Sequence, residues 1–251
     1  MVSLEQLVAR LDHELNTEKI ADYPGAMNGL QLSNSGQVTR IVAAVDASLA
    51  VVEAAAAGGS GLLVVHHGMF WQGAQPVTGA FYRKLKIAID SDLAIYSSHL
   101  PLDVHPVLGN NILLANGIGL SEPTPFLDRK GLLIGIRGKW NGTRFALAET
   151  LRELLGSSVH LCPGGPETIS EVGVITGGAG GEIAKVAAHG LDCFITGEGP
   201  HWSYPLAEEL GVNLFYGGHY ATETFGVKAI SALMARAFSI PWEFLDHPTG
   251  L

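Results

Sequence analysis

The sequence predicts an α/β fold with two similar lobes, each built on a mostly parallel or mixed sheet flanked by helices. In each half, a short apolar run, an amphipathic or alanine-rich stretch and a second apolar run follow one another, which is the pattern of a βαβ unit. The strands of a βαβ unit pair in parallel, so a parallel sheet is expected in each half. The segments are residues 41–45, 48–57 and 61–65 in the first half and 172–176, 182–189 and 191–196 in the second.

A repeated spacing of polar residues indicates an internal duplication. Tyr96-x-x-His99-x-x-x-Asp103 has the same spacing as Tyr216-x-x-His219-x-x-x-Glu223. We therefore predict a first lobe over 1–125 and a second over 126–251, with the C-terminal helix packing back on the first lobe. Equivalent strand ends of two duplicated lobes would face one shared cleft.

The remaining elements follow from periodicity and turn residues. Ser3 and Gln6 form a capping box before an apolar stripe, which predicts a helix over 3–16. Two closely spaced prolines make residues 121–125 the best candidate for a linker. Further helices are expected at 78–90, 108–118, 203–210 and 221–238, and further strands at 93–96 and 213–216.

Composition restricts the class of function. The 251 residues carry a net charge of −9, which argues against a nucleic-acid partner because such proteins need a basic surface. Cys162 and Cys193 form no CxxC motif and suggest no disulfide framework. No secretory signal and no membrane-spanning apolar run is visible, so we expect a cytoplasmic protein without a membrane partner.

Two adjacent histidines at the end of an apolar run are the strongest functional signal. His66 and His67 follow five strand-forming residues, and ligand groups collect at the carboxyl ends of strands in α/β proteins. Neighbouring residues on a regular strand face opposite sides, so we expect both histidines in the turn after the strand, where they can approach two different ions. The alternative is a pair of hydrogen-bonded structural histidines.

Three residues complete the candidate ligand set. His219 and Glu223 follow two glycines at a strand-to-helix junction, where an i, i+4 spacing brings both side chains to one point. Asp103 gains weight from the repeated spacing. The alternatives are that Glu223 interacts with a helix dipole and that Asp103 is a helix cap.

Other polar residues near these motifs are candidates for catalysis or substrate contact. Glu198 is a candidate general base or water-orienting group, and His99 a candidate catalytic or substrate-contacting residue. The alternatives are that Glu198 is an exposed acid of a loop and that His99 is a surface histidine. His105 and His201 are either functional or simply exposed. The glycine-rich loop at 177–181 is either a phosphate cradle or a tight βα turn.

The five candidate ligands, His66, His67, Asp103, His219 and Glu223, contain no sulfur, which suits zinc, iron, manganese or cobalt. Five side chains do not saturate two divalent ions, so we predict two ions about 3.5–4 Å apart with Glu223 as the bridge and open positions for water. A metal pair of this kind presents hydroxide to an electrophilic carbon or phosphorus. The substrate is expected to be a small, anionic molecule, since bound metal would supply positive charge.

Six short segments, in order along nearly the whole chain, carry a resemblance to a known family. They are Asn28–Leu32, Val45–Ala47, Val65–Gly68, Ser98-His99-x-x-x-Asp103, Thr196–Glu198 and Gly218-His219-x-Ala221-Thr222-Glu223. In these segments the sequence resembles the GTP cyclohydrolase 1 type 2 homologue family, also called NGG-interacting-factor-like proteins, in its compact form without an inserted domain.

The resemblance implies two α/β lobes, metals held by the same five residues in the cleft between the lobes, and a toroidal homohexamer. Two functional classes remain open. One is a dinuclear metal-dependent hydrolase acting on GTP, another nucleotide, a cyclic amide or a phosphoester. The other is a noncatalytic metal-binding or interaction protein with a ring-shaped scaffold role.

Overall fold

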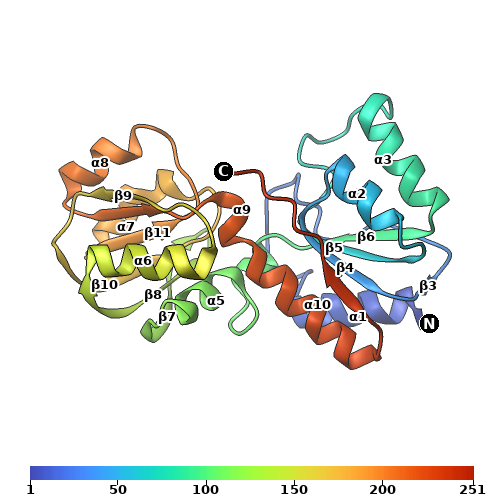
Figure 1. The fold of residues 1–251 in the computed structure, drawn as a ribbon, viewed down its shortest axis with the longest axis horizontal. Helices are drawn as coiled ribbons and strands as arrows, with labels where there is room; N and C mark the ends of the chain where they lie inside the picture. Colours follow the sequence, from blue (N-terminus) through green and yellow to red (C-terminus); the bar gives the residue numbers. More distant parts are fainter. The chain divides into compact units, whose positions relative to one another are not determined.

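The computed structural model describes residues 1–251 and divides into two compact units (Figure 1). Unit 1 comprises Met1–Leu102 and Gly226–His247, and unit 2 comprises Asp103–Phe225 and Pro248–Leu251. Each unit contains one large sheet with helices packed on it, as expected for the α/β class. None of the helices combines the length and the apolar character that crossing a bilayer requires.

Unit 1 is organised around a five-stranded sheet with the strand order β13-β4-β5-β6-β2. All neighbouring strands are parallel except β2, which pairs antiparallel with β6. The strands are β4 (Ile41–Asp46), β5 (Gly61–His67), β6 (Leu93–Ser97), β2 (Gly29–Leu32) and β13 (Trp242–Phe244); a separate two-stranded sheet pairs β1 (Val2–Ser3) with β3 (Gln37–Val38). The helices are α1 (Leu4–Leu15), α2 (Leu49–Ala56), α3 (Gly79–Asp90), α4 (Leu100–Asp103) and α10 (Thr224–Phe238).

Burial on both faces explains why the strands of unit 1 are almost continuously apolar. Figure 1 shows α2 and α3 on one face of the sheet, and Val42, Leu63 and Ile95 pack against them in one core cluster. The predicted capping of the first helix is confirmed, since the Ser3 side chain accepts a hydrogen bond from the Gln6 amide at 3.4 Å.

Unit 2 contains a six-stranded mixed sheet with the order β7-β8-β10-β11-β12-β9. Its central strands β10, β11 and β12 are parallel, and the outer pairings are antiparallel. The strands are β7 (Ser121–Arg129), β8 (Leu132–Thr143), β9 (His160–Pro163), β10 (Thr168–Val174), β11 (Cys193–Thr196) and β12 (Asn213–Tyr216). The helices are α5 (Asn110–Gly117), α6 (Arg144–Leu155), α7 (Ile183–Ala188), α8 (Ser203–Leu210) and α9 (His219–Thr222), with a 3-10 turn η1 at Gly180–Glu182.

Helices cover both faces of the sheet in unit 2 as well. Leu147 of α6 packs with Val172 and Phe215 on one face, and Ile183 of α7 packs with Phe194 on the other. Both faces are therefore buried, and the edge formed by the carboxyl ends of β10, β11 and β12 is where polar side chains can gather.

The prediction of a linker at residues 121–125 was wrong, because these residues open strand β7 at the edge of the sheet. Pro123 and Pro125 are tolerated there because an edge strand leaves half of its amide positions without a partner strand. The register shift between Ser121 and Thr124 marks an irregularity at the same place.

The helix predicted over 221–238 is divided in two. The short helix α9 ends at Thr222, and α10 begins at Thr224, so Glu223 lies at the break with φ −108° and ψ 7°. Glu223 is thus held by the junction of two helices and not by the body of one.

Candidate metal centre

Three histidines of unit 1 form a compact group of possible metal ligands. His66 and His67 end β5, and His99 follows β6, the strand that pairs with β5 in parallel. One ring nitrogen of each histidine lies within 4.8 Å of those of the other two. Strand β5 continues through His67, so the expectation that the pair would follow the strand in a turn was wrong. The rings are nonetheless tilted toward one another, with the His66 and His67 centroids 4.7 Å apart.

Each of these rings is fixed through its Nδ1 atom. Nδ1 of His66 lies 2.9 Å from the carbonyl oxygen of Ser98, and Nδ1 of His67 lies 2.9 Å from Oδ1 of Asp46. Nδ1 of His99 lies 3.0 Å from Oδ1 of Asp22. A neutral imidazole that donates from Nδ1 carries its lone pair on Nε2, so this bonding presents Nε2 as the ligand atom.

Asp22, which the sequence analysis did not identify, holds the segment around His99 in place. Its side chain is 5% exposed and accepts hydrogen bonds from Asn28 Nδ2 at 2.8 Å and from the Leu100 amide at 2.9 Å. Burial alone would raise the pKa of Asp22. Its hydrogen bonds and the charge interaction with His99 outweigh this effect and lower the pKa to about 2.

We expect Asp22→Ala to lower the free energy of unfolding by about 2–3 kcal/mol, because several partly buried donors would lose their acceptor together. Urea unfolding of metal-free protein, followed by circular dichroism, measures this loss. The matched control is Asp90→Ala, which removes an exposed i, i+4 ion pair with Lys86 and should change stability by less than about 0.5 kcal/mol. Equal effects of the two substitutions would contradict this role of Asp22.

An aromatic pocket borders the histidines of unit 1. The Trp71 ring lies edge-on to His99 at 4.8 Å and to His67 at 5.7 Å between centroids. Trp71 and Phe70 line a largely apolar cavity of about 530 Å³ together with the turn at Pro24 and Gly25. A ligand held by these histidines would therefore have an apolar wall beside it.

Unit 2 carries the second group of donors at the carboxyl edge of its sheet. Oε2 of Glu223 lies 3.2 Å from Nε2 of His219, and a carboxylate oxygen of Asp103 lies within 4.8 Å of one of Glu223. Asn110 Nδ2 donates to Oδ1 of Asp103 at 2.8 Å and so fixes that carboxylate. Two carboxylates this close repel each other unless positive charge lies beside them.

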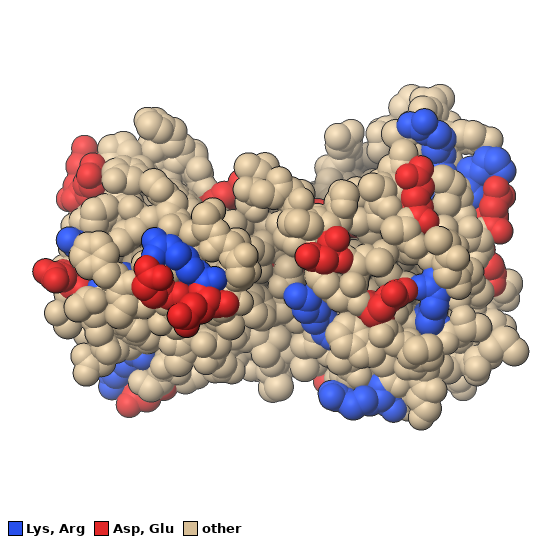
Figure 2. All heavy atoms as spheres, in the orientation of Figure 1, with Lys and Arg blue, Asp and Glu red and all other residues tan.

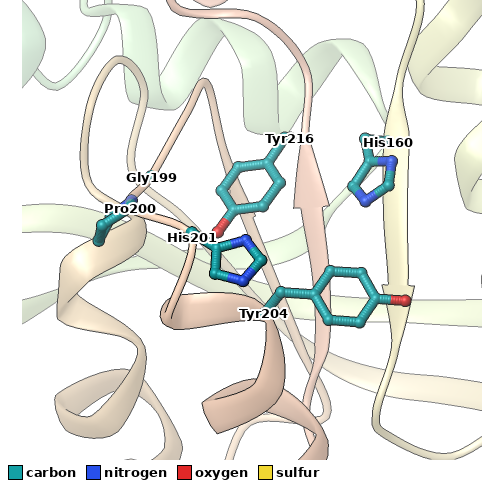
Figure 3. Close-up of a pocket in the computed structure, with 6 residues that line it drawn as sticks. All are labelled: His160, Gly199, Pro200, His201, Tyr204 and Tyr216. Atoms are coloured by element: carbon teal, nitrogen blue, oxygen red, sulfur yellow. The ribbon is translucent and has the colours of Figure 1, made fainter.

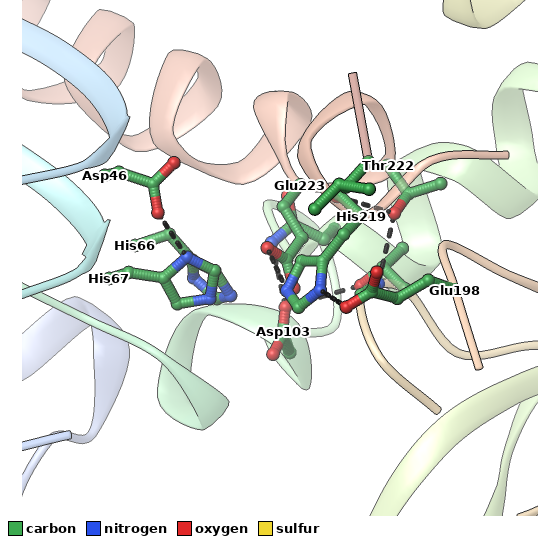
Figure 4. Close-up of polar contacts among 12 residues, drawn as sticks. Asp46, His66, His67, Asp103, Glu198, His219, Thr222 and Glu223 are labelled. Atoms are coloured by element: carbon green, nitrogen blue, oxygen red, sulfur yellow. Dashed lines mark hydrogen bonds and ion pairs between the residues drawn. The ribbon is translucent and has the colours of Figure 1, made fainter. Parts of the chain in front are cut away.

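Glu198 fixes His219 in the same way that Asp46 fixes His67. Oε1 of Glu198 lies 2.8 Å from Nδ1 of His219. Figure 4 marks this contact with a dashed line. Burial disfavours the imidazolium, but hydrogen bonds and charge from Glu223 and Glu198 outweigh it and raise the pKa of His219 to about 9. The carboxylates of Glu223 and Glu198 around His219 therefore favour positive charge at this position, which suits a cation site.

The glycine-rich loop at 177–181 is a structural turn that makes room for these ligands. The Gly177 amide donates to Thr222 Oγ1 at 3.1 Å, and the Gly180 amide donates to the Glu198 carbonyl at 2.9 Å. These two N–H groups therefore already have acceptors within the protein. A Cβ atom on Gly177, where φ is +69°, would lie 2.1 Å from Oε1 of Glu223. These contacts favour the tight turn over the phosphate cradle, the two interpretations that the sequence left open.

Of the histidines whose roles the sequence left open, His105 has a local one: its Nδ1 accepts from the Leu108 amide at 2.9 Å, in the turn before α5. Sequence analysis also missed Asp46, although its position at the end of β4, opposite His67 in the ladder, was a usable signal. Figure 4 shows Asp46 beside His67.

The charged side chains on the surface form no strongly basic patch in the view of Figure 2. Acidic and basic side chains are interspersed on the visible face of each unit.

Comparisons with known proteins agree on the family. A protein of Deinococcus radiodurans named "GTP cyclohydrolase 1 type 2 homolog" is 42% identical over 237 residues, 93% of this chain and 90% of the relative. A protein of the same name from Halobacterium salinarum is 38% identical and is covered, like this chain, over 100% of its length. Among solved structures, protein ybgI, described as of unknown function, matches with a TM-score of 0.93 and 33% identity over 100% of both chains.

A second solved structure, TTHA1606 from Thermus thermophilus, matches with a TM-score of 0.91 and 36% identity over 100% of both chains. The family model Duf34/NIF3 (NGG1p interacting factor 3) matches residues 2–249. Since the match spans nearly the whole sequence, the chain belongs to the Duf34/NIF3 family.

Proposed function

We propose that the protein is a metal-dependent hydrolase with a pair of divalent ions. His66 and His67 of unit 1 and Asp103, His219 and Glu223 of unit 2 are the proposed ligands, with Glu223 as the bridge. The ions are zinc, iron, manganese or cobalt, the metals that mixed imidazole and carboxylate ligands suit.

The observation that carries the proposal is how the imidazoles are held. His66, His67 and His219 each have Nδ1 within 2.9 Å of an oxygen acceptor in their own unit. Structural histidines use either nitrogen, whereas metal-binding histidines donate one ring N–H to a carboxylate or carbonyl and bind through the other nitrogen. The same bonding at all three positions supports a role as metal ligands.

The charges of the two donor groups complement each other. Of the proposed ligands, unit 1 offers the imidazoles of His66 and His67, which are neutral as ligands, and unit 2 offers one imidazole with the carboxylates of Asp103 and Glu223. Divalent ions need anionic ligands to offset their charge, and neutral imidazoles alone do not provide them. Ligands from both units together would meet this need.

When bound, such a pair of ions lowers the pKa of a coordinated water and so supplies a nucleophile near neutral pH. We propose that two residues of the chain act in catalysis at this site. Glu198 holds His219 through Oε1, and its side chain is 45% exposed, so its second oxygen can accept a proton from water. His99, held by Asp22, is proposed to contact the leaving group of the substrate.

The substrate we propose is a small anionic molecule, and GTP is the first one to test because relatives carry the name "GTP cyclohydrolase 1 type 2 homolog". Other nucleotides, cyclic amides and phosphoesters belong to the same test. We further propose that the protein is cytoplasmic and that it forms a homohexamer. Light scattering on the purified protein checks the oligomeric state.

Elemental analysis of the purified protein, followed by hydrolysis assays with and without added manganese, zinc or iron, tests the proposed function. We expect bound metal in stoichiometric amount and turnover that disappears on chelation and returns with one of these ions. Substoichiometric metal together with no turnover across the substrate panel would contradict the hydrolase and favour the noncatalytic scaffold.

Glu198→Gln tests the positioning of His219 separately. The amide keeps the size of the side chain but removes its charge, so His219 becomes a poorer ligand and metal affinity is expected to fall about 10–100-fold. Competition with a chromophoric chelator measures this affinity. Glu182→Gln is the control, because it makes the same chemical change at a glutamate whose ion pair is with Lys185 and not with a candidate ligand. Unchanged affinity in Glu198→Gln would contradict the positioning role.

A further inference from the structure

A second pocket in unit 2, separate from the candidate ligands, is lined mainly by rings. Figure 3 shows the side chains that line it. The cavity has a volume of about 390 Å³. Its volume lies at the lower end of the range for small-molecule sites, enough for a single ring system. The lining residues are His160, Gly199, Pro200, His201, Tyr204 and Tyr216.

Strand pairing brings two of these rings to the same face of the sheet. His160, the first residue of β9, is the cross-strand partner of Tyr216, the last residue of β12. Their rings are nearly parallel, at 18°, with centroids 6.3 Å apart. Tyr204 of α8 adds a third ring, with its centroid 5.7 Å from that of His160. Aromatic faces from three different elements therefore border one cavity.

Hydrogen bonds within unit 2 hold the pocket walls in position. The buried hydroxyl of Ser203 bonds to the Tyr216 hydroxyl and donates to the Pro200 carbonyl, which ties β12 to the loop before α8. A Cβ atom on Gly199 would lie 2.9 Å from the Tyr216 hydroxyl, so only a glycine allows this close packing. A site whose walls are already fixed loses little entropy when a ligand binds.

The chemistry of the lining selects a class of ligand. It offers flat aromatic faces for stacking and two imidazoles that can donate or accept hydrogen bonds. It includes no lysine or arginine, so it lacks the charged side chains that usually hold a phosphate group. A flat ring that carries nitrogen donors and acceptors matches both features, whereas a phosphate has no face that can stack.

We propose that this pocket binds a planar nitrogen heterocycle of the size of a nucleobase. The pocket borders the turn that carries Glu198, since Gly199 and Pro200 form one of its walls. The claim that the bound ring is part of the substrate rests on the proposed function. The claim that the pocket binds such a ring is independent of it.

Binding of guanosine and adenosine to the full-length protein, measured by isothermal titration calorimetry after metal removal by chelation, tests the proposal. We expect both nucleosides to bind with dissociation constants at or below the millimolar range and ribose not to bind. Nucleoside binding no tighter than that of ribose would overturn the proposal. The measurement is made without metal, so it can succeed or fail independently of the metal centre.

Variants of Tyr204 show whether stacking is responsible. Tyr204→Leu should weaken nucleoside binding about tenfold, as expected for the loss of one base–aromatic contact, whereas Tyr204→Phe keeps the aromatic face and should bind like the wild type. Tyr82→Leu, at a tyrosine of α3 that is 51% exposed, is the control. His160→Leu provides a second test at the edge of the sheet if Tyr204→Leu does not fold. Binding unaffected by the loss of either ring would contradict the assignment.

If the ring is the substrate's, Tyr204→Leu and His160→Leu should also raise KM in the metal-loaded protein and leave the metal content unchanged. Unchanged KM together with weakened nucleoside binding would show that the pocket binds a ring that is not part of the substrate. That result would overturn the link to the metal centre while the pocket assignment stands.

Discussion

The Glu223→Gln variant is expected to lose both metal ions together and, with them, any hydrolytic activity. Glu223 is 2% exposed and its carboxylate contacts Nε2 of His219, so it cannot turn away to solvent. An amide of the same shape removes the negative charge that a bridging ligand must supply. Metal affinity should fall by at least about tenfold, since replacing even the groups behind the ligands costs about 10–100-fold in affinity.

Elemental analysis of the purified variant measures this loss directly. Glu153→Gln, at an exposed glutamate of α6, makes the same chemical change away from the site and should keep the wild-type metal content. Loss of a single ion from Glu223→Gln would count against Glu223 as the bridge, and full retention of metal would remove it from the ligand set.

Gly177→Ala should abolish metal binding although it adds only one methyl group. The new Cβ would lie 2.1 Å from Oε1 of Glu223 and 3.3 Å from Nε2 of His219, so the ligands must move. The positive φ of Gly177 adds backbone strain of about 1 kcal/mol for a residue with a side chain.

Gly190→Ala separates the two effects. Gly190 has φ +71°, almost the same as Gly177, but nothing lies within 4 Å of a Cβ added there. Both variants should lose a similar amount of stability to backbone strain in urea unfolding, and only Gly177→Ala should also lose metal. If both variants bind metal normally, Gly177 does not determine the position of Glu223.

The parts of the fold that local patterns encode could be predicted from the sequence. The apolar run at Gly61–Val65 and the alanine-rich stretch before it produced the expected β4-α2-β5 unit, because burial on both faces demands continuous apolar strands. The sequence also identified His66 and His67 as candidate ligands, and their rings lie together at the end of β5. The internal duplication stays a prediction.

Features that depend on distant partners were not predictable. Strand β13 is short and finds its place only by pairing with β4, about 200 residues earlier in the chain. The prolines at 123 and 125 indicate a linker locally, but an edge position in a sheet accommodates them. Asp22 lies 77 residues from His99, and no spacing rule connects them. Strand β8 and helix α6 were not predicted from the sequence at all.

The most direct test of the central claim is a crystal structure of the metal-loaded protein with anomalous diffraction recorded at the absorption edge of the metal. We expect two anomalous peaks about 2.0–2.2 Å from the Nε2 atoms of His66, His67 and His219 and the carboxylate oxygens of Asp103 and Glu223. Peaks bound only by residues of one unit, or bound through Nδ1, would contradict the proposed centre.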